Sequence, residues 1–377
     1  MPLPTRFLAL ACFGLALALS ACGDAFSPEE TAPEGLFDDS PLLPALSAAD
    51  AGDWQWIPTD GMQCRDGSDT GFGLRRAAGS RDLLIYLEGG GACFDFLTCL
   101  LNPRRFSEAD FDARVAEVGE SGAFSSTAAA NPFLGWNVLY VPYCTGDVHS
   151  GDATGVRVPG VGRQDFVGLR NMEAMLNVID GPARQADQVV LSGSSAGGFG
   201  TVGTYGLVSD RLAPAPVDLL NDSGPSVEDD AVFPPSLQQT WRDLWALDAS
   251  IPAGCPDAIC SQPDGDGLEA VLPYYAITNP DRNFGLFTYD RDLVIRSFFG
   301  GPSGPAFENS LFDLRPVLPA NAGTYFVPGS DHTFLLGDAF YNTTVEGVPL
   351  TSWVANLVNG QATDLPAAQS LMVAQGR

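Results

Sequence analysis

A β-branched apolar run that turns through Gly-x-Ser-x-Gly constrains this sequence more than any other feature. The run 189–191 leads into the motif at 193–197, and the residues after it can begin a helix. A serine at the apex of a tight strand-to-helix turn leaves little space for its neighbours two positions before and after. Because Gly193 and Gly197 occupy those two positions, the pattern predicts Ser195, and not Ser194, as the candidate nucleophile.

Backbone donors for an oxyanion are predicted on two segments. The N–H of Ala196 would lie at the N-terminus of the helix that follows the turn, where it can bond the oxyanion formed when Ser195 attacks a carbonyl. A second N–H is expected from Gly90 or Gly91, which follow a continuous apolar strand at 82–87.

Strand and helix patterns alternate along the rest of the chain. A hairpin is predicted around 64–74 and an insertion at 226–280 that forms a lid or a substrate wall. Further strands are predicted at 82–87, 137–142, 189–192, 217–220, 283–289 and 324–328, and further helices at 166–179, 196–205, 292–299 and 349–358. This alternation predicts an α/β fold with a mostly parallel sheet flanked by helices. With the serine turn, it predicts an α/β-hydrolase.

The general base is well constrained because the chain contains two histidines, His149 and His332. In an α/β-hydrolase the catalytic groups follow in the order serine, acid, histidine, each after a strand. His332 follows the last predicted strand, whereas His149 precedes Ser195. We therefore predict His332 as the base.

The acid has several candidates. Asp290 follows the strand before the histidine strand and is ranked first, and Asp222 follows the strand before that and is ranked second. Asp292 lies close behind Asp290, and Asp331 adjoins the histidine. For Asp222, within Asp-Ser-Gly-Pro, a turn or a helix cap is the alternative interpretation.

Composition excludes several classes of function. The formal net charge is −27, and all 19 basic residues are arginine. Without lysine, neither a Schiff-base enzyme nor a Walker-type phosphate loop is possible, and the negative charge disfavours nucleic acid as a partner. We predict no cofactor and no metal, a small or polysaccharide ester as the substrate, and leave the oligomeric state open.

The N-terminus predicts export. Arg6 precedes an apolar segment at 7–19, and Leu-Ser-Ala-Cys at 19–22 is similar to a bacterial lipobox with Cys22 as the lipidated residue. We predict a signal peptide at 1–21, a flexible tether at 22–50 and a hydrolase domain at 51–377. The lipid would be the only membrane contact of a lipoprotein at the cell envelope.

Six of the eight cysteines lie in the predicted domain. An even number in an exported chain favours disulfides over zinc, because the spacings lack a Cys-x-x-Cys pair. Cys93 with Cys99 and Cys255 with Cys260 are predicted as local pairs, which leaves Cys64 and Cys144.

Several segments together resemble the pectin acetylesterase family, which includes the carboxylesterase Notum. The similar segments are 87–93, 141–151, 193–198, 221–224, 287–290 and 330–332. The resemblance implies an α/β-hydrolase that removes acetyl or other acyl groups as esters. It also implies the pairs Cys64–Cys144 and Cys93–Cys99 and favours Asp290 as the acid.

The resemblance guides the expectations for substrate binding. Plant members carry a tryptophan where this chain has Ala92, which implies a more open pocket wall there. His149 and Asp147 lie in a predicted loop at the end of the sheet where the active site forms, and we predict that His149 lines the pocket mouth. The alternatives to a short-acyl carbohydrate esterase are a catalytically silent glycan-binding lipoprotein and an esterase or thioesterase for lipid acyl groups.

Overall fold

The computed structural model describes residues 34–38, 51–262 and 267–367 of the chain. These residues belong to one compact unit that begins at Pro33. The predicted signal peptide, Cys22 and most of the predicted tether lie outside the described residues. In the described ranges, no helix combines the length and the apolar character needed to cross a membrane.

The part of the predicted tether that is described packs on the domain. Leu36 and Phe37 are buried in the core, and the backbone N–H of Leu36 donates to the carbonyl of Ser80 at 2.8 Å. Asp38 pairs with the guanidinium of Arg76 at 2.9 Å. The prediction of an unbroken flexible tether over 22–50 is therefore wrong at 34–38. Burial of the Leu36 and Phe37 side chains away from water stabilises this segment on the domain.

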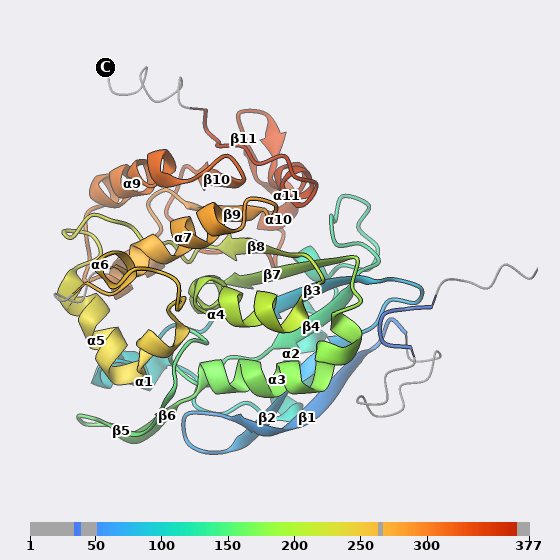
Figure 1. Cartoon of the computed structure of the whole chain (residues 1–377), viewed down its shortest axis with the longest axis horizontal. Helices are drawn as coiled ribbons and strands as arrows, with labels where there is room; N and C mark the ends of the chain where they lie inside the picture. Colours follow the sequence, from blue (N-terminus) through green and yellow to red (C-terminus); the bar gives the residue numbers. More distant parts are fainter. Residues whose placement is uncertain (1–33, 39–50, 263–266, 368–377) are drawn as a thin grey trace, which may run out of the picture. The chain divides into compact units, whose positions relative to one another are not determined.

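A sheet of eight strands organises the described domain (Figure 1). Its spatial order is β1-β2-β4-β3-β7-β8-β9-β10. The strands are β1 (Trp54–Gln63), β2 (Asp69–Arg75), β3 (Asp82–Leu87), β4 (Asn137–Val141), β7 (Gln188–Ser194), β8 (Val217–Asp222), β9 (Phe284–Tyr289) and β10 (Ala322–Val327). β2 pairs antiparallel with β1 and β4, and all other neighbours are parallel. The predicted α/β-hydrolase sheet is confirmed.

Central strand β3 is buried on both faces, as its apolar run predicts. Leu83 and Ile85 belong to one hydrophobic cluster, whereas Leu84 and Tyr86 belong to another. Because side chains alternate between the two faces of a strand, these clusters lie on opposite sides of the sheet. A sheet covered on both sides leaves its C-terminal edge as the place where a site can open.

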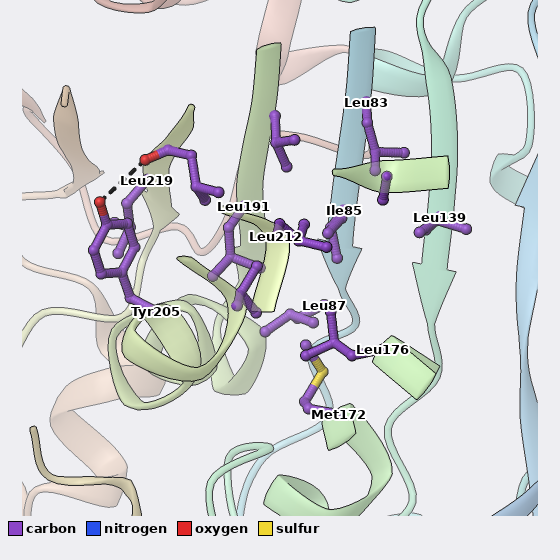
Figure 2. Close-up of a cluster of buried hydrophobic side chains, with 14 of the residues drawn as sticks. Leu83, Ile85, Leu87, Leu139, Met172, Leu176, Leu191, Tyr205, Leu212 and Leu219 are labelled. Carbon is purple, nitrogen blue, oxygen red and sulfur yellow. Dashed lines mark hydrogen bonds between the residues drawn. The ribbon is translucent and has the colours of Figure 1, made fainter. Parts of the chain in front are cut away.

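Two long helices cover the first face. In Figure 2, Met172 and Leu176 of α3 (Gly168–Ala183) lie near Leu87 of β3. From α4 (Ala196–Leu212), the Tyr205 hydroxyl donates to the carbonyl of Val217 at 3.1 Å. Helix α4 is therefore fixed to the sheet along its length, which holds its N-terminus beside the end of β7.

The second face is covered by α2 (Glu108–Val118) and α11 (Leu350–Val358), which contribute Phe111 and Trp353 to the cluster there. The sequence patterns did not predict α2, the short α1 (Phe96–Leu101) or the hairpin of β5 (Ala153–Val158) and β6 (Gly162–Phe166), which lies outside the main sheet.

The remaining elements are α8 (Leu293–Phe298), α9 (Gly304–Asp313), α10 (Ala339–Asn342), β11 (Thr344–Val345) and β12 (Val348–Pro349).

The segment between β8 and β9 is the predicted insertion. It contains α5 (Pro235–Trp245), α6 (Asp257–Cys260) and α7 (Val271–Thr278). Trp241 and Trp245 of α5 stack at 5.1 Å in a third buried cluster, which also contains Ala196 at the start of α4. The insertion therefore packs against the helix that follows the serine turn.

Three disulfides join the six cysteines of the domain. They are Cys64–Cys144, Cys93–Cys99 and Cys255–Cys260. All three predicted pairs are confirmed. The first bond ties the chain after β1 to the loop after β4, and the second fixes α1 to the glycine segment after β3.

Candidate active site

Ser195 lies in the predicted strand–turn–helix between β7 and α4, with φ 58° and ψ −120°. A non-glycine residue in this region is strained and must be held by its surroundings. A Cβ on Gly193 would lie 2.5 Å from the carbonyl oxygen of Gly197, and a Cβ on Gly197 would overlap the carbonyl of Leu87. Both glycines are thus required by close packing around the turn.

A pocket of about 320 Å³ opens at Ser195, at the C-terminal edge of the sheet. Ser195, His332, Gly90 and Gly91 all line it. Ala196 follows Ser195 directly as the first residue of α4 and is buried. The remaining lining residues are Tyr86, Glu88, Gly89, Arg114, Ser194, Val294, Phe298, Thr333 and Leu336. The described residues contain no group of three or more His, Cys, Asp or Glu placed to hold a metal ion.

His332 follows β10 and is oriented by a carboxylate. Its Nδ1 lies 2.7 Å from Oδ2 of Asp292. Because a carboxylate accepts, Nδ1 carries the hydrogen in the neutral ring and Nε2 is left as an acceptor. Nε2 is buried and has no hydrogen-bond partner in the described part of the chain, Ser195 included. Catalytic hydrogen bonds of this kind often tighten only when a substrate binds.

Asp292 is fully buried and is itself fixed by α8, whose N-cap it forms. Its Oδ1 accepts from the backbone N–H groups of Val294 and Ile295 at 2.9 and 3.0 Å. Oδ1 therefore caps α8 while Oδ2 bonds His332. The cap fixes the orientation of the carboxylate, and the carboxylate in turn fixes the orientation of the imidazole. An aspartate before an apolar helical run is a recognisable N-cap signal, which marks Asp292 as a helix cap but does not predict its bond to His332.

The prediction of Asp290 as the partner of His332 is wrong. Its Oδ1 accepts from the N–H of Gly329 at 3.0 Å, and its own N–H bonds the carbonyl of Val327. Asp290 is thus bonded to the residues at the end of β10. The carboxylate that bonds His332 belongs to Asp292, two residues further along the chain. Burial raises the pKa of Asp290.

The second-ranked candidate, Asp222, has other hydrogen-bond partners than the imidazole of His332. Its Oδ2 accepts from the Ser194 hydroxyl and from the N–H groups of Phe334 and Leu335. Burial raises the pKa of Asp222, and these hydrogen bonds act in the opposite direction.

An ion pair in the pocket wall was not predicted from the sequence. Oε1 of Glu88 lies 2.9 Å from Nε of Arg114, and Oε2 accepts from the N–H of Tyr143 at 3.0 Å. Burial raises the pKa of Glu88. Burial by itself would lower the pKa of Arg114, but the interactions with Glu88, Tyr140 and Glu117 together outweigh burial, and the pKa is raised. Arg114 comes from α2, whose position no local pattern reveals.

The three predicted substrate-binding residues lie behind the pocket rather than in it. His149 is 2% exposed, with Nε2 at 2.8 Å from the carbonyl of Glu88 and its ring 4.8 Å from that of Tyr143. Asp147 is fully buried, and Ala92 is 4% exposed. These predictions are wrong because the loop after β4 folds under the strand end, where the Asp147 carboxylate accepts backbone N–H groups.

The insertion is not a lid over this pocket. Within the described ranges, none of its residues lines the Ser195 pocket. Its aromatic side chains turn instead toward α4 and Ala196, in the buried cluster that contains Trp241 and Phe233. The prediction of a lid is therefore wrong, and the insertion packs against α4, the helix that follows Ser195.

The burial of His149 predicts a pH effect on stability. Burial lowers its pKa from 6.5 to about 4. Between these values the unfolded chain binds a proton that the folded chain does not, so stability is lost as the pH falls from 6.5 toward 4. At about 1.4 kcal/mol per pKa unit, the loss approaches about 3 kcal/mol.

Urea unfolding of the wild type and of His149→Gln at pH 7 and pH 5 checks this. We expect the wild type to lose more stability than the variant between the two values. Equal losses in both proteins would contradict the burial of a neutral imidazole.

The site and its sheet define an α/β-hydrolase with a serine on the strand-to-helix turn. Comparison with family models matches residues 54–284 to the pectinacetylesterase family. The chain belongs to this family.

Curated relatives match parts of the chain. Palmitoleoyl-protein carboxylesterase notum1 of Xenopus laevis is 35% identical over 159 residues, which cover 40% of this chain and 31% of the relative. Pectin acetylesterase 4 of Arabidopsis thaliana is 29% identical over 205 residues, which cover 52% and 49%. The match thus spans about a third to a half of these relatives' lengths.

A solved structure extends the likeness in fold. The Wnt deacylase Notum from Drosophila, in a second crystal form, aligns with a TM-score of 0.59 and 19% identity, and the alignment covers 82% of this chain and 94% of that one. At this identity the comparison supports the α/β-hydrolase fold.

Proposed function

We propose that this protein is a serine carboxylesterase that hydrolyses acetyl or other short acyl esters on a carbohydrate or related alcohol. The observation that carries the proposal is the orientation of His332. Its Nδ1 is held by Asp292 at 2.7 Å, and its Nε2 has no hydrogen-bond partner among the described residues, in the pocket that Ser195 also lines. Membership of the pectinacetylesterase family supports the same reaction class.

The reaction follows from this arrangement. As Ser195 Oγ attacks the ester carbonyl, its proton passes to Nε2 of His332, and Asp292 stabilises the imidazolium that forms. The oxyanion is bonded by the N–H of Ala196 and by that of Gly90 or Gly91. The proton then moves to the leaving alcohol oxygen, which gives an acyl-enzyme. Water, deprotonated by the same histidine, releases the carboxylic acid and restores Ser195.

Polar character in the pocket favours a short acyl group and a polar alcohol. The Glu88–Arg114 ion pair and the Tyr86 and Ser194 hydroxyls lie in its wall, and the aliphatic and phenyl side chains among its lining residues are Val294, Phe298 and Leu336. A long acyl chain needs a continuous apolar tunnel.

The space behind Ala196 cannot supply such a tunnel because aromatic rings fill it. Phe233 stacks on Phe299 at 4.4 Å, and Trp241 packs against Phe199 at 6.1 Å. The apolar cavity left beside Phe199, Phe233 and Trp241 measures about 50 Å³.

An acyl-length series tests the proposal. We expect kcat/KM to be highest for acetyl or butyryl esters of one alcohol and to fall by about tenfold or more at octanoyl, since a misfit acyl group costs 1–3 kcal/mol of transition-state binding. Acetylated sugars should also be substrates. A rate that rises steadily to palmitoyl would overturn the short-acyl assignment and favour a lipid deacylase, and no turnover of any ester would favour a glycan-binding protein.

We also propose that the protein is exported and anchored by a lipid on Cys22, as the lipobox at 19–22 predicts. Mass spectrometry of the mature N-terminal peptide tests this proposal. A diacylated Cys22 at the new N-terminus supports it, and an unmodified N-terminus at another residue contradicts it.

A further inference from the structure

Asp222 is a fully buried carboxylate for which the proposed reaction has no use. It is the last residue of β8, which lies between β7, the strand that leads to Ser195, and β9, the strand that precedes Asp292. Its side chain accepts four hydrogen bonds, three on Oδ2 and one, from the Ser223 hydroxyl, on Oδ1. So large a set of donors around one buried side chain indicates a defined task.

One group of donors comes from the loop that carries the base. The N–H groups of Phe334 and Leu335 donate to Oδ2 of Asp222 at 2.9 and 3.0 Å. Directly before them, Thr333 has φ 63°, a strained conformation for a β-branched residue. The carboxylate thus holds the turn that immediately follows His332.

The other group comes from the nucleophile turn. The Ser194 hydroxyl donates to Oδ2 of Asp222 at 2.8 Å and accepts from the Tyr86 hydroxyl at 3.0 Å. The main chain adds a second tie, because the N–H of Ser195 donates to the carbonyl of Asp222 at 2.8 Å. Asp222 therefore binds the strained residue Ser195 itself and the two residues that directly follow the strained Thr333.

We propose that Asp222 is a positioning residue that sets the distance and direction between Ser195 and His332. It acts through the backbone of the two loops, whereas Asp292 acts on the imidazole itself. The inference rests on the proposed function, because it assigns Ser195 and His332 their roles. The strand end is a suitable anchor, since the parallel sheet on either side of β8 fixes its position.

The chemistry favours a carboxylate at this position. Phe334 and Leu335 are almost fully buried, so loss of their acceptor would leave two N–H groups away from water. Asparagine can keep its oxygen toward these donors while its amide faces the Ser223 hydroxyl, which can turn to accept. Alanine keeps none of the four bonds.

We therefore expect Asp222→Ala to lower kcat on a small acetyl ester by about 100-fold with KM changed by less than about threefold, the scale of a misplacement near 1 Å. Asp222→Asn should keep kcat within about tenfold of the wild type, because one oxygen retains three of the four bonds. Hydrogen exchange at the amides of Phe334 and Leu335 should become faster in the alanine variant.

Asp218 supplies a matched control on the same strand. It is 4% exposed and accepts from the N–H of Asn283 at 2.8 Å and from the amide of Gln188 at 3.1 Å, at the opposite end of β8. Asp218→Ala should lower the melting temperature but leave kcat within about threefold, since it touches neither loop.

Several outcomes decide the inference. A folded Asp222→Ala enzyme with kcat within threefold of the wild type, or unchanged exchange at Phe334 and Leu335, would overturn it. If the alanine variant does not fold, Asp222→Glu keeps the charge but displaces the carboxylate, and its kcat should still fall by about tenfold or more. If the wild type hydrolyses no ester, the proposed function fails, and hydrogen exchange alone then decides whether Asp222 holds the loop.

Discussion

Replacing Ser195 with alanine is expected to reduce ester turnover by about four or more orders of magnitude, the scale of a lost nucleophile in a catalytic triad. The attacking oxygen disappears, while the pocket and the oxyanion donors remain. The main chain at φ 58° also suits alanine no worse than serine, so the fold should persist. Initial rates with an activated acetyl ester, together with labelling by a fluorophosphonate probe, measure the loss.

Ser194→Ala is the matched control, because it removes a hydroxyl one residue away. This hydroxyl is engaged with Tyr86 and Asp222 and lies outside the proposed proton path. We expect a loss of about tenfold or less, the cost of a few hydrogen bonds in a positioning network. Probe labelling abolished by Ser194→Ala in a folded protein would show that the nucleophile is assigned to the wrong serine.

Asp292→Asn should be nearly as damaging, with kcat reduced by about four orders of magnitude, because the wrong imidazole tautomer is favoured. Oδ1 of the asparagine can still cap α8 through Val294 and Ile295. The amide would then face Nδ1 of His332 and donate to it, which places the ring hydrogen on Nε2. Such a ring cannot accept the proton of Ser195.

Asp290→Asn provides the comparison, since Asp290 lies two residues away. Its oxygen can continue to accept from Gly329, so we expect kcat within about threefold of the wild type. Circular dichroism and thermal unfolding establish that both variants fold. A larger loss in Asp290→Asn than in Asp292→Asn would contradict the assignment of Asp292 as the acid.

Local patterns were sufficient for much of the fold. The apolar run of β3, the helical spacing in α3 and the glycines around Ser195 each reflect constraints between residues close in sequence. His332 was identified because a chain with two histidines offers few bases and the fold orders its catalytic groups along the chain. The three disulfides followed from the even number of cysteines, their short spacings and the family resemblance.

Tertiary structure alone decided which carboxylate meets the base. Asp222, Asp290 and Asp292 all lie at or just after the ends of strands, and a shift of two residues, from Asp290 to Asp292, exchanges a bond to the end of β10 for a bond to the imidazole. Such a choice depends on the path of two loops that are 40 residues apart in sequence.

Which side chains are buried was also decided by the tertiary structure. The sequence marked His149 as polar and near the site, but whether its ring lines the pocket or bonds Glu88 beneath it depends on how the loop after β4 folds. The pairing of Glu88 with Arg114 and the packing of Phe37 likewise join segments whose proximity no local pattern encodes. Sequence by itself determined most strands of the main sheet, the turn that carries Ser195 and the candidate base, because these follow from short-range geometry. Only the folded chain determined the candidate acid and the pocket wall, because those contacts are made across the sheet edge.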